Sequence, residues 1–188
     1  MSKKDKKLLK IKKIFKTKKL GTSAVIFISF FLIFIQTAGS FYSKALSGFS
    51  YAGLIIIDAF YLLKNLISNN KFSGLKKAQL ASIILNAAVL MILSITVVLK
   101  SLSTMTTHQT NADVVILTTW VTCMFLIVYS SSYKKFMYTS IFSIFITVGF
   151  GIFKNYHQTD FILSIFFCII TLIRSAILIK DTILDYKK

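Results

Sequence analysis

The chain alternates long apolar runs with short polar segments. The apolar runs occupy residues 22–41, 45–67, 78–99, 113–130, 136–153 and 160–180. Each is close to the roughly 20 residues that an α-helix needs to cross a hydrocarbon core of about 30 Å. The runs lack the alternation of a β-barrel strand, and no proline interrupts them. The pattern predicts an all-α polytopic membrane protein with six transmembrane helices.

The six runs leave little sequence for a soluble domain. Hydrophobic residues make up 55% of the 188 residues, and the mean hydropathy is +0.73. We therefore expect three parts: a basic cytoplasmic N-terminal segment at 1–20, a transmembrane domain at 21–181 and a short cytoplasmic tail at 182–188.

Positive charge is distributed unevenly between the two sets of loops. The formal net charge of +17 would suggest a nucleic-acid partner in a soluble chain, but here the lysines gather before the first run and in every second loop after it. That set comprises the lysines of residues 1–20 together with Lys71, Lys76, Lys77, Lys134, Lys135, Lys180, Lys187 and Lys188. The other loops carry Lys44, Lys100 and Lys154 with His108 and His157. The positive-inside rule then predicts a cell-membrane protein with both termini in the cytoplasm and no nucleic-acid partner.

The N-terminal segment has two interpretations. Leu8, Ile11, Ile14 and Phe15 recur at helical spacing among lysines, which is typical of an amphipathic helix on an anionic inner leaflet. The alternative is a disordered orientation signal. A cleaved signal peptide is not expected, because the apolar run that follows is long.

Asp58 lies inside the second apolar run. A carboxylate within a membrane span costs a few kcal/mol and commonly faces a partner or a water-filled cavity. Ser47, Asp58, Tyr61 and Asn65 share one helical face. The functional interpretation is a proton-linked or cation-attracting group. The structural interpretation is a carboxyl hydrogen-bonded to Tyr61, Asn86 or a serine of a neighbouring helix.

The sixth run carries a second polar stripe at helical spacing. Its members are Asp160, Ser164, Cys168, Thr171 and Ser175. Small residues in such a stripe are more typical of close helix packing than of a permeation path. Arg174, near the inner end of this run, is expected to extend to the cytoplasmic headgroups.

Enzymatic chemistry is not indicated. Ser, His and Asp form no catalytic arrangement, and neither a P-loop nor a dinucleotide-binding fingerprint occurs. Cys123 and Cys168 fall inside apolar runs without C-x-x-C spacing, as expected of small packing residues. We predict no enzyme activity and no cofactor.

Three segments resemble the cation diffusion facilitator family of membrane transporters. The second run, with Asp58, Ala59, Tyr61 and Asn65, resembles the family's second helix, L-x-x-D-A-x-H-x-x-x-D. Residues 71–80 are similar to the family's F-x-x-G-x-x-[RK]-x-E, and Asn86 lies where the third helix often carries asparagine. Residues 159–164 resemble A-D-P-x-x-S. The resemblance covers roughly residues 22–185 and implies a six-helix bundle of that family's kind.

The chain departs from the family at its metal ligands. In the family, His and Asp one turn apart on helix two, with a second such pair on helix five, hold zinc or a similar ion. The counterpart positions are Tyr61 and Asn65 in the second run, and Ser132 and Phe136 near the fifth. Tyr and Asn do not supply the negative charge that a dehydrated divalent cation requires. We predict no metal site, and the eight residues after Lys180 leave no room for the family's cytoplasmic C-terminal domain.

Two functions follow as hypotheses. The first is a divergent transporter of a small cation or other solute that lacks the usual zinc site. Its candidate path residues are Asp58, Tyr61, Asn65 and Asn86. The alternative is a non-transporting membrane partner, such as an accessory subunit or an immunity or regulatory protein. In both cases we expect a homo- or hetero-oligomer in contact with the lipid bilayer.

Overall fold

The computed structural model of the protein describes residues 22–69, 73–104, 110–130, 134–152 and 158–186. Within these ranges the chain forms six α-helices and no β-strand. They are α2 (Thr22–Ser43), α3 (Leu46–Asn69), α4 (Ser73–Thr104), α5 (Ala112–Ser130), α6 (Lys134–Ile152) and α7 (Thr159–Tyr186). The all-α prediction is confirmed, and each predicted apolar run coincides with one helix. The predicted basic segment at 1–20 lies outside the described residues.

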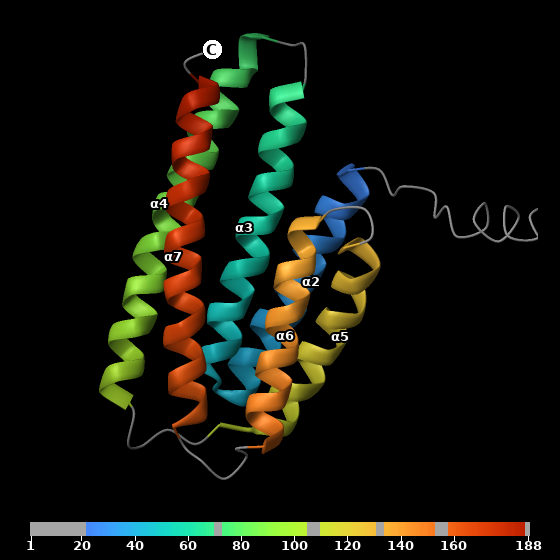
Figure 1. The fold of residues 1–188 in the computed structure, drawn as a ribbon. Coiled ribbons are helices and arrows are strands. Elements are labelled where there is room, and N and C mark those ends of the chain that lie inside the picture. Colours follow the sequence, from blue (N-terminus) through green and yellow to red (C-terminus); the bar gives the residue numbers. More distant parts are fainter. Residues whose placement is uncertain (1–21, 70–72, 105–109, 131–133, 153–157, 187–188) are drawn as a thin grey trace, which may run out of the picture.

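Consecutive helices run in opposite directions along one bundle (Figure 1). Helix α7 packs between α4 and α3, while α2 packs against α3 and α5, and α5 packs against α6. Helix α3 therefore lies between two sets of helices, with α4 and α7 on one side and α2, α5 and α6 on the other. At the end where α7 terminates, α3, α4 and α7 extend well past the other three helices (Figure 1). This difference in length determines which faces of α3 are covered.

Helix α3 is the most enclosed of the four long apolar helices. Of its apolar stretch 78% is buried inside the bundle, whereas the value for α4 is 17%. Its Tyr51, Leu54 and Ile55 belong to a core shared with α2, α5, α6 and α7. Nearer the long end, Ile57 and Tyr61 belong to a second core shared with α4 and α7. A polar side chain on α3 is consequently surrounded by protein, unless it lies beyond the ends of its neighbours.

Two glycines permit close packing of α2. A Cβ atom on Gly39 would lie 2.3 Å from Cγ2 of Thr118 in α5, and a Cβ atom on Gly48 of α3 would lie 2.2 Å from Oγ of Ser40. Side chains cannot approach so closely, so the contacts of α2 with α3 and α5 depend on these residues. Small residues at helix contacts are typical of membrane bundles.

Four helices are long and apolar enough to cross a membrane. The candidate spans are Ala24–Ser43, Leu46–Ser68, Lys77–Ser103 and Thr159–Tyr186, and the apolar parts of α5 and α6 are shorter, at Ala112–Ile127 and Tyr138–Ile152. Large apolar side chains such as Phe27, Phe34, Leu85 and Ile92 are exposed on the outside of the bundle. A surface of this kind suits hydrocarbon better than water. The prediction of a membrane protein fits these four helices, each of which could span a membrane by its length and composition.

Helix α7 continues through Tyr186, past the end of the predicted transmembrane domain at 181. Its last turns are tied to α3, because Nζ of Lys64 lies 3.1 Å from Oδ2 of Asp185 and Ser68 donates a hydrogen bond of 3.2 Å to the same oxygen. Lys77 of α4 lies over the ring of Tyr186. These contacts explain why part of the predicted tail is helical.

Candidate functional site

The candidate site is built around Asp58 of α3, which is 1% exposed. Arg174 of α7 donates a hydrogen bond from Nη2 to Oδ1 of Asp58 and forms an ion pair with it. Thr139 of α6 donates from its hydroxyl to Oδ2. Both carboxylate oxygens are therefore bound by side chains from different helices, and three helices meet at one carboxylate.

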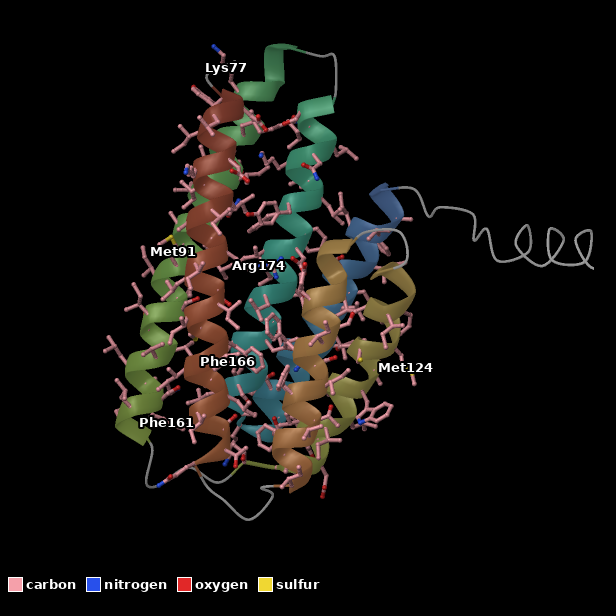
Figure 2. All side chains as sticks on the ribbon, in the orientation of Figure 1. Lys77, Met91, Met124, Phe161, Phe166 and Arg174 are labelled. Carbon is pink, nitrogen blue, oxygen red and sulfur yellow. The ribbon has the colours of Figure 1, made fainter. Side chains whose placement is uncertain are left out.

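Arg174 is the only arginine of the chain. Its Nη1 also donates a hydrogen bond of 3.4 Å to Oγ1 of Thr139, and 18% of its side chain is exposed. Figure 2 shows Arg174 where α7 passes α3. The predicted position of this guanidinium at the cytoplasmic headgroups is wrong. A carboxylate at the same height in a low-dielectric interior attracts the guanidinium more strongly than a distant interface does.

The ion pair lies deep in the apolar part of the bundle. With a rise of roughly 1.5 Å per residue, Arg174 lies about 22 Å along α7 from Thr159, and Asp58 lies about 18 Å along α3 from Leu46. A hydrocarbon core is about 30 Å thick. If the core begins at the ends of these helices, the pair lies roughly two thirds of the way through it.

A cleft of about 370 Å³ opens beside the ion pair, and its lining comes from α3, α6 and α7. It is lined by Tyr61, Tyr138, Phe142, Ile170, Arg174 and Ile177. Arg174 is the only charged residue in this lining, and Tyr138 on the outer wall is 58% exposed. The cleft is thus a mostly apolar space whose lining includes Arg174 and two tyrosines.

The four predicted path residues do not lie together. Asp58 and Tyr61 are buried, whereas Asn65 and Asn86 are exposed, and Nδ2 of Asn86 donates a hydrogen bond of 3.3 Å to Ser82 of the same helix. Asn65 shares the face of Asp58, but α3 extends past the start of α6 at this level (Figure 1). The shared face was predicted, but the sequence did not show that Asn65 lies beyond the start of the helix that packs on that face.

The observed partners of Asp58 differ from those suggested by the sequence. The structural interpretation named Tyr61, Asn86 or a serine, and it did not name Arg174 or Thr139, both of which bind Asp58 in the structure. One signal could have identified Arg174, since it is the only basic residue well inside the sixth apolar run, while Asp58 is the only acidic residue well inside the second. Nothing in the sequence distinguishes Thr139 from the other hydroxyls of α6.

The polar stripe of α7 forms a buried packing surface, as predicted. Asp160 accepts hydrogen bonds of 2.9 Å from the backbone N–H groups of Leu46 and Ser47 and one of 2.5 Å from the Ser47 hydroxyl. It thereby caps the N-terminus of α3 from another helix. Ser164 lies 3.1 Å from Ser50 and 3.0 Å from Ser101, hydroxyl to hydroxyl, which links α7 to α3 and α4.

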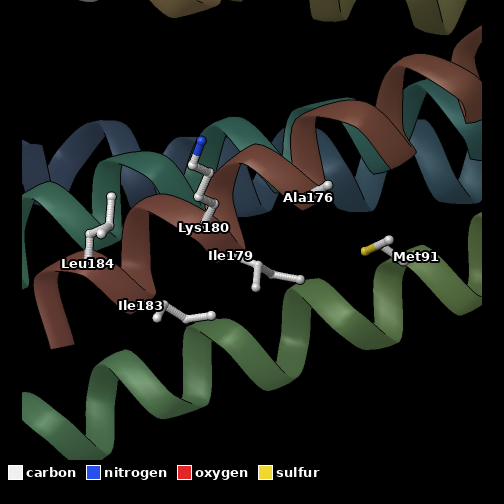
Figure 3. Close-up of a pocket in the computed structure, with 6 residues that line it drawn as sticks. All are labelled: Met91, Ala176, Ile179, Lys180, Ile183 and Leu184. Carbon is white, nitrogen blue, oxygen red and sulfur yellow. The ribbon is translucent and has the colours of Figure 1, made fainter. Parts of the chain in front are cut away.

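A second groove, of about 430 Å³, lies between α4 and α7. Its lining comprises Met91, Ala176, Ile179, Lys180, Ile183 and Leu184 (Figure 3). Lys180 points away from α4, so its ammonium group does not enter the groove (Figure 3). The residues that line this groove direct no polar group into it, so it offers no recognition chemistry for a polar ligand.

Metal-binding groups are not clustered in the part of the chain that the structure describes. Among those residues, no group of three or more His, Cys, Asp or Glu side chains could hold a metal ion. Ser132, His108 and His157 lie outside the described residues. Tyr61, at one of the family's ligand positions, lines the cleft beside Arg174, a cation that opposes the binding of another cation.

A scan against protein-family models and a comparison with curated proteins each find no match for this chain.

Proposed function

We propose that the protein is a proton-linked membrane transporter of a small solute, and that the Asp58–Arg174 pair is its working centre. In this proposal all six helices cross the cell membrane and both termini lie in the cytoplasm. The end of the bundle where α7 terminates carries Lys64, Lys77, Lys134, Lys135 and Lys180, whereas the opposite end carries Lys44 and Lys100. The positive-inside rule supports that orientation.

The observation that carries the proposal is the buried ion pair beside a cleft. Two charges inside a bilayer are costly, and a buried pair is often no more stabilising than apolar residues of similar volume. Most of the surrounding bundle is held together by apolar packing and by neutral hydroxyls. A charged pair next to an accessible space is therefore better explained by function than by stability.

The pair supplies a mechanism that links protons to solute. When a proton binds Asp58, the carboxyl loses its charge and its hold on Arg174 weakens. The guanidinium of Arg174, a residue that lines the cleft and whose side chain is 18% exposed, then needs another acceptor in a medium of low dielectric constant. A solute that carries a hydrogen-bond acceptor can then bind the guanidinium. When Asp58 loses its proton, it binds Arg174 again and the solute is released. Thr139 fixes the second carboxylate oxygen and so positions Asp58.

The resemblance to cation diffusion facilitators stays a prediction and contributes no ligand to this proposal. Because Arg174 already compensates the charge of Asp58, the proposed solute is one that interacts with the guanidinium. That differs from the cation expected from the family.

The test is solute-driven proton movement in vesicles. Purified protein is reconstituted into vesicles loaded with a pH-sensitive dye and challenged with small anionic, cationic and neutral solutes. We expect one solute class to change the internal pH with wild-type protein and not with Asp58→Asn. Asp185→Asn is the matched control, because Asp185 pairs with Lys64 away from the cleft. Equal signals from wild type and Asp58→Asn with every solute would contradict transport through this centre.

A non-transporting membrane partner is the second candidate. It is favoured by one observation: both oxygens of Asp58 are bound by side chains of the same protein, so the pair is also suited to fixing α3, α6 and α7 in place. In that case mild-detergent extraction from native membranes should return a second membrane protein in fixed ratio, and the vesicle experiment should give no solute-dependent signal.

A further inference from the structure

We infer that the cleft between α6 and α7 binds a monocarboxylic acid with an apolar body, whose carboxyl group bonds Arg174 while its proton passes to Asp58. This rests on the proposed function, since it names the solute class for the same centre. The cleft is lined by Arg174, Tyr61 and Tyr138, with Phe142, Ile170 and Ile177 as apolar walls. Asp58 does not line the cleft but is bound to Arg174.

The position of the cleft on the outside of the bundle favours an amphiphilic ligand. Two of the three helices that line it expose large side chains on the outside of the bundle: Tyr138 of α6 is 58% exposed and Ile177 of α7 is 48% exposed. In a membrane those side chains contact lipid, so a ligand enters sideways from the hydrocarbon region. An apolar body gains favourable contacts there and is not penalised by desolvation. The volume of about 370 Å³ is near the lower end of the range for small-molecule pockets, which suits one compact or medium-length chain.

The charge at the base of the cleft selects the head group. Arg174 is the only charged lining residue and directs a guanidinium toward Asp58, with part of its side chain exposed. A guanidinium presents paired N–H donors that match the two oxygens of a carboxylate. A carboxylate ligand therefore resembles the group that Arg174 already binds.

Charge balance favours a carboxylic acid over other anionic amphiphiles. A neutral acid carries no net charge into the low-dielectric cleft. At the base, the O–H bond of the ligand breaks and an O–H bond forms at Asp58, and the Nη–H donors of Arg174 bond the new carboxylate. One positive and one negative charge are present before and after the step. A permanently ionised phosphate or sulfate would instead add an uncompensated negative charge.

The proton donor and the proton acceptor are the same kind of chemical group. Both the ligand and Asp58 are carboxyl groups, so the proton moves between two sites of similar intrinsic affinity. Tyr138, which lines the cleft, has a hydroxyl that can donate to the oxygen that the guanidinium leaves free. The arrangement thus recognises a carboxyl group without a second cation.

Equilibrium binding of radiolabelled decanoate to the full-length protein in phosphatidylcholine nanodiscs tests this inference. We expect saturable one-to-one binding above the partitioning into empty nanodiscs. Decyl sulfate, which remains ionised, should compete at least tenfold less effectively, and decanol should not compete.

Two tryptophan variants separate the cleft from the rest of the surface. Ile177→Trp fills the cleft without replacing a member of the ion pair, and it should weaken decanoate binding at least tenfold. Ile183→Trp fills the groove between α4 and α7 (Figure 3) and should bind decanoate like wild type. Arg174→Gln should also lose binding, with a thermal melt to show that the protein is folded.

Three results would overturn the inference: no saturable binding by wild type, equal binding by wild type and Ile177→Trp, or decyl sulfate competing as well as decanoate. Failure of the proposed function is distinguishable. Decanoate binding without any solute-driven proton movement would support the ligand class and contradict transport. Proton movement driven by an unrelated solute, without decanoate binding, would support transport and contradict the ligand class.

Discussion

Two buried aspartates lie along the contact between α3 and α7, and they are held in different ways. Asp160 is 3% exposed and Asp58 is 1% exposed. Asp160 lies at the start of α7 and receives two backbone N–H groups and one hydroxyl at the N-terminus of α3. Asp58 lies in the middle of α3 and receives a guanidinium and a hydroxyl.

The difference distinguishes structural from functional use of the same residue type. At Asp160 the compensating charge is the partial positive charge of a helix end, which cannot move away without unfolding α3. At Asp58 it is a flexible side chain next to a cleft, which can exchange one acceptor for another. Both aspartates are buried, so burial does not distinguish their roles. The groups that donate hydrogen bonds to them differ, because only Asp58 binds a charged side chain that can move.

The largest expected effect follows removal of one member of the ion pair. Asp58→Asn leaves the guanidinium of Arg174 without a counter-charge, and breaking a buried pair in this way costs about 3–5 kcal/mol. The free energy of unfolding in a detergent titration measures this loss. The double variant Asp58→Asn/Arg174→Gln should recover most of the stability, and equal losses for the single and double variants would show that the charge pairing is not the cause.

Removal of the helix cap should have a smaller effect that is confined to stability. Asp160→Ala deprives Leu46, Ser47 and the Ser47 hydroxyl of their acceptor, and loss of such a cap costs about 2 kcal/mol. Decanoate binding, measured on protein that remains folded, should be unchanged. A loss of binding comparable with that of Arg174→Gln would remove the distinction between the two aspartates.

Thr139→Val is expected to cost less again and to affect function. The substitution removes the hydroxyl that donates to Oδ2 of Asp58, and a hydrogen bond to a charged group contributes about 1.5–3 kcal/mol. Arg174 still binds the other carboxylate oxygen, which places the loss near the lower figure. Because the carboxylate is then less well positioned, solute-driven proton movement should fall several-fold in the vesicle assay, and an unchanged rate would exclude a positioning role.

The smallest change is expected at a buried hydroxyl that has no observed use. Oγ1 of Thr171 is buried without a hydrogen-bond partner in the described part of the structure. Thr171→Val retains the shape and removes an unsatisfied polar atom, so stability should be unchanged or should rise by about 1 kcal/mol. It is the matched control for Thr139→Val. A marked loss of stability would indicate a polar partner such as bound water.

The sequence predicted the helices well and their mutual contacts poorly. Apolar runs and the absence of proline were sufficient to place six helices, since hydrophobic length is a local property. The predicted packing stripe from Asp160 to Ser175 was also correct, because spacing along one helix is local. The predicted site failed where it depended on neighbours. Asn65 is exposed because α6 begins too late to cover it.

The ion pair joins residues that are 116 positions apart in the chain. Sequence reasoning assigned Arg174 to the headgroups from its distance to the end of the run, which is a one-helix argument. Its actual partner follows from the packing of α7 against α3. The cleft depends on the same packing, since its lining comes from three helices, and no local pattern specifies it.

The central claim is that the Asp58–Arg174 pair works in transport and does not merely hold the bundle together. The double variant Asp58→Asn/Arg174→Gln tests it most directly, because it removes both charges while keeping the side-chain volumes similar. We expect thermal stability close to that of wild type and complete loss of solute-driven proton movement in vesicles. A double variant that is stable and still moves protons with the same solute at the wild-type rate would contradict the claim.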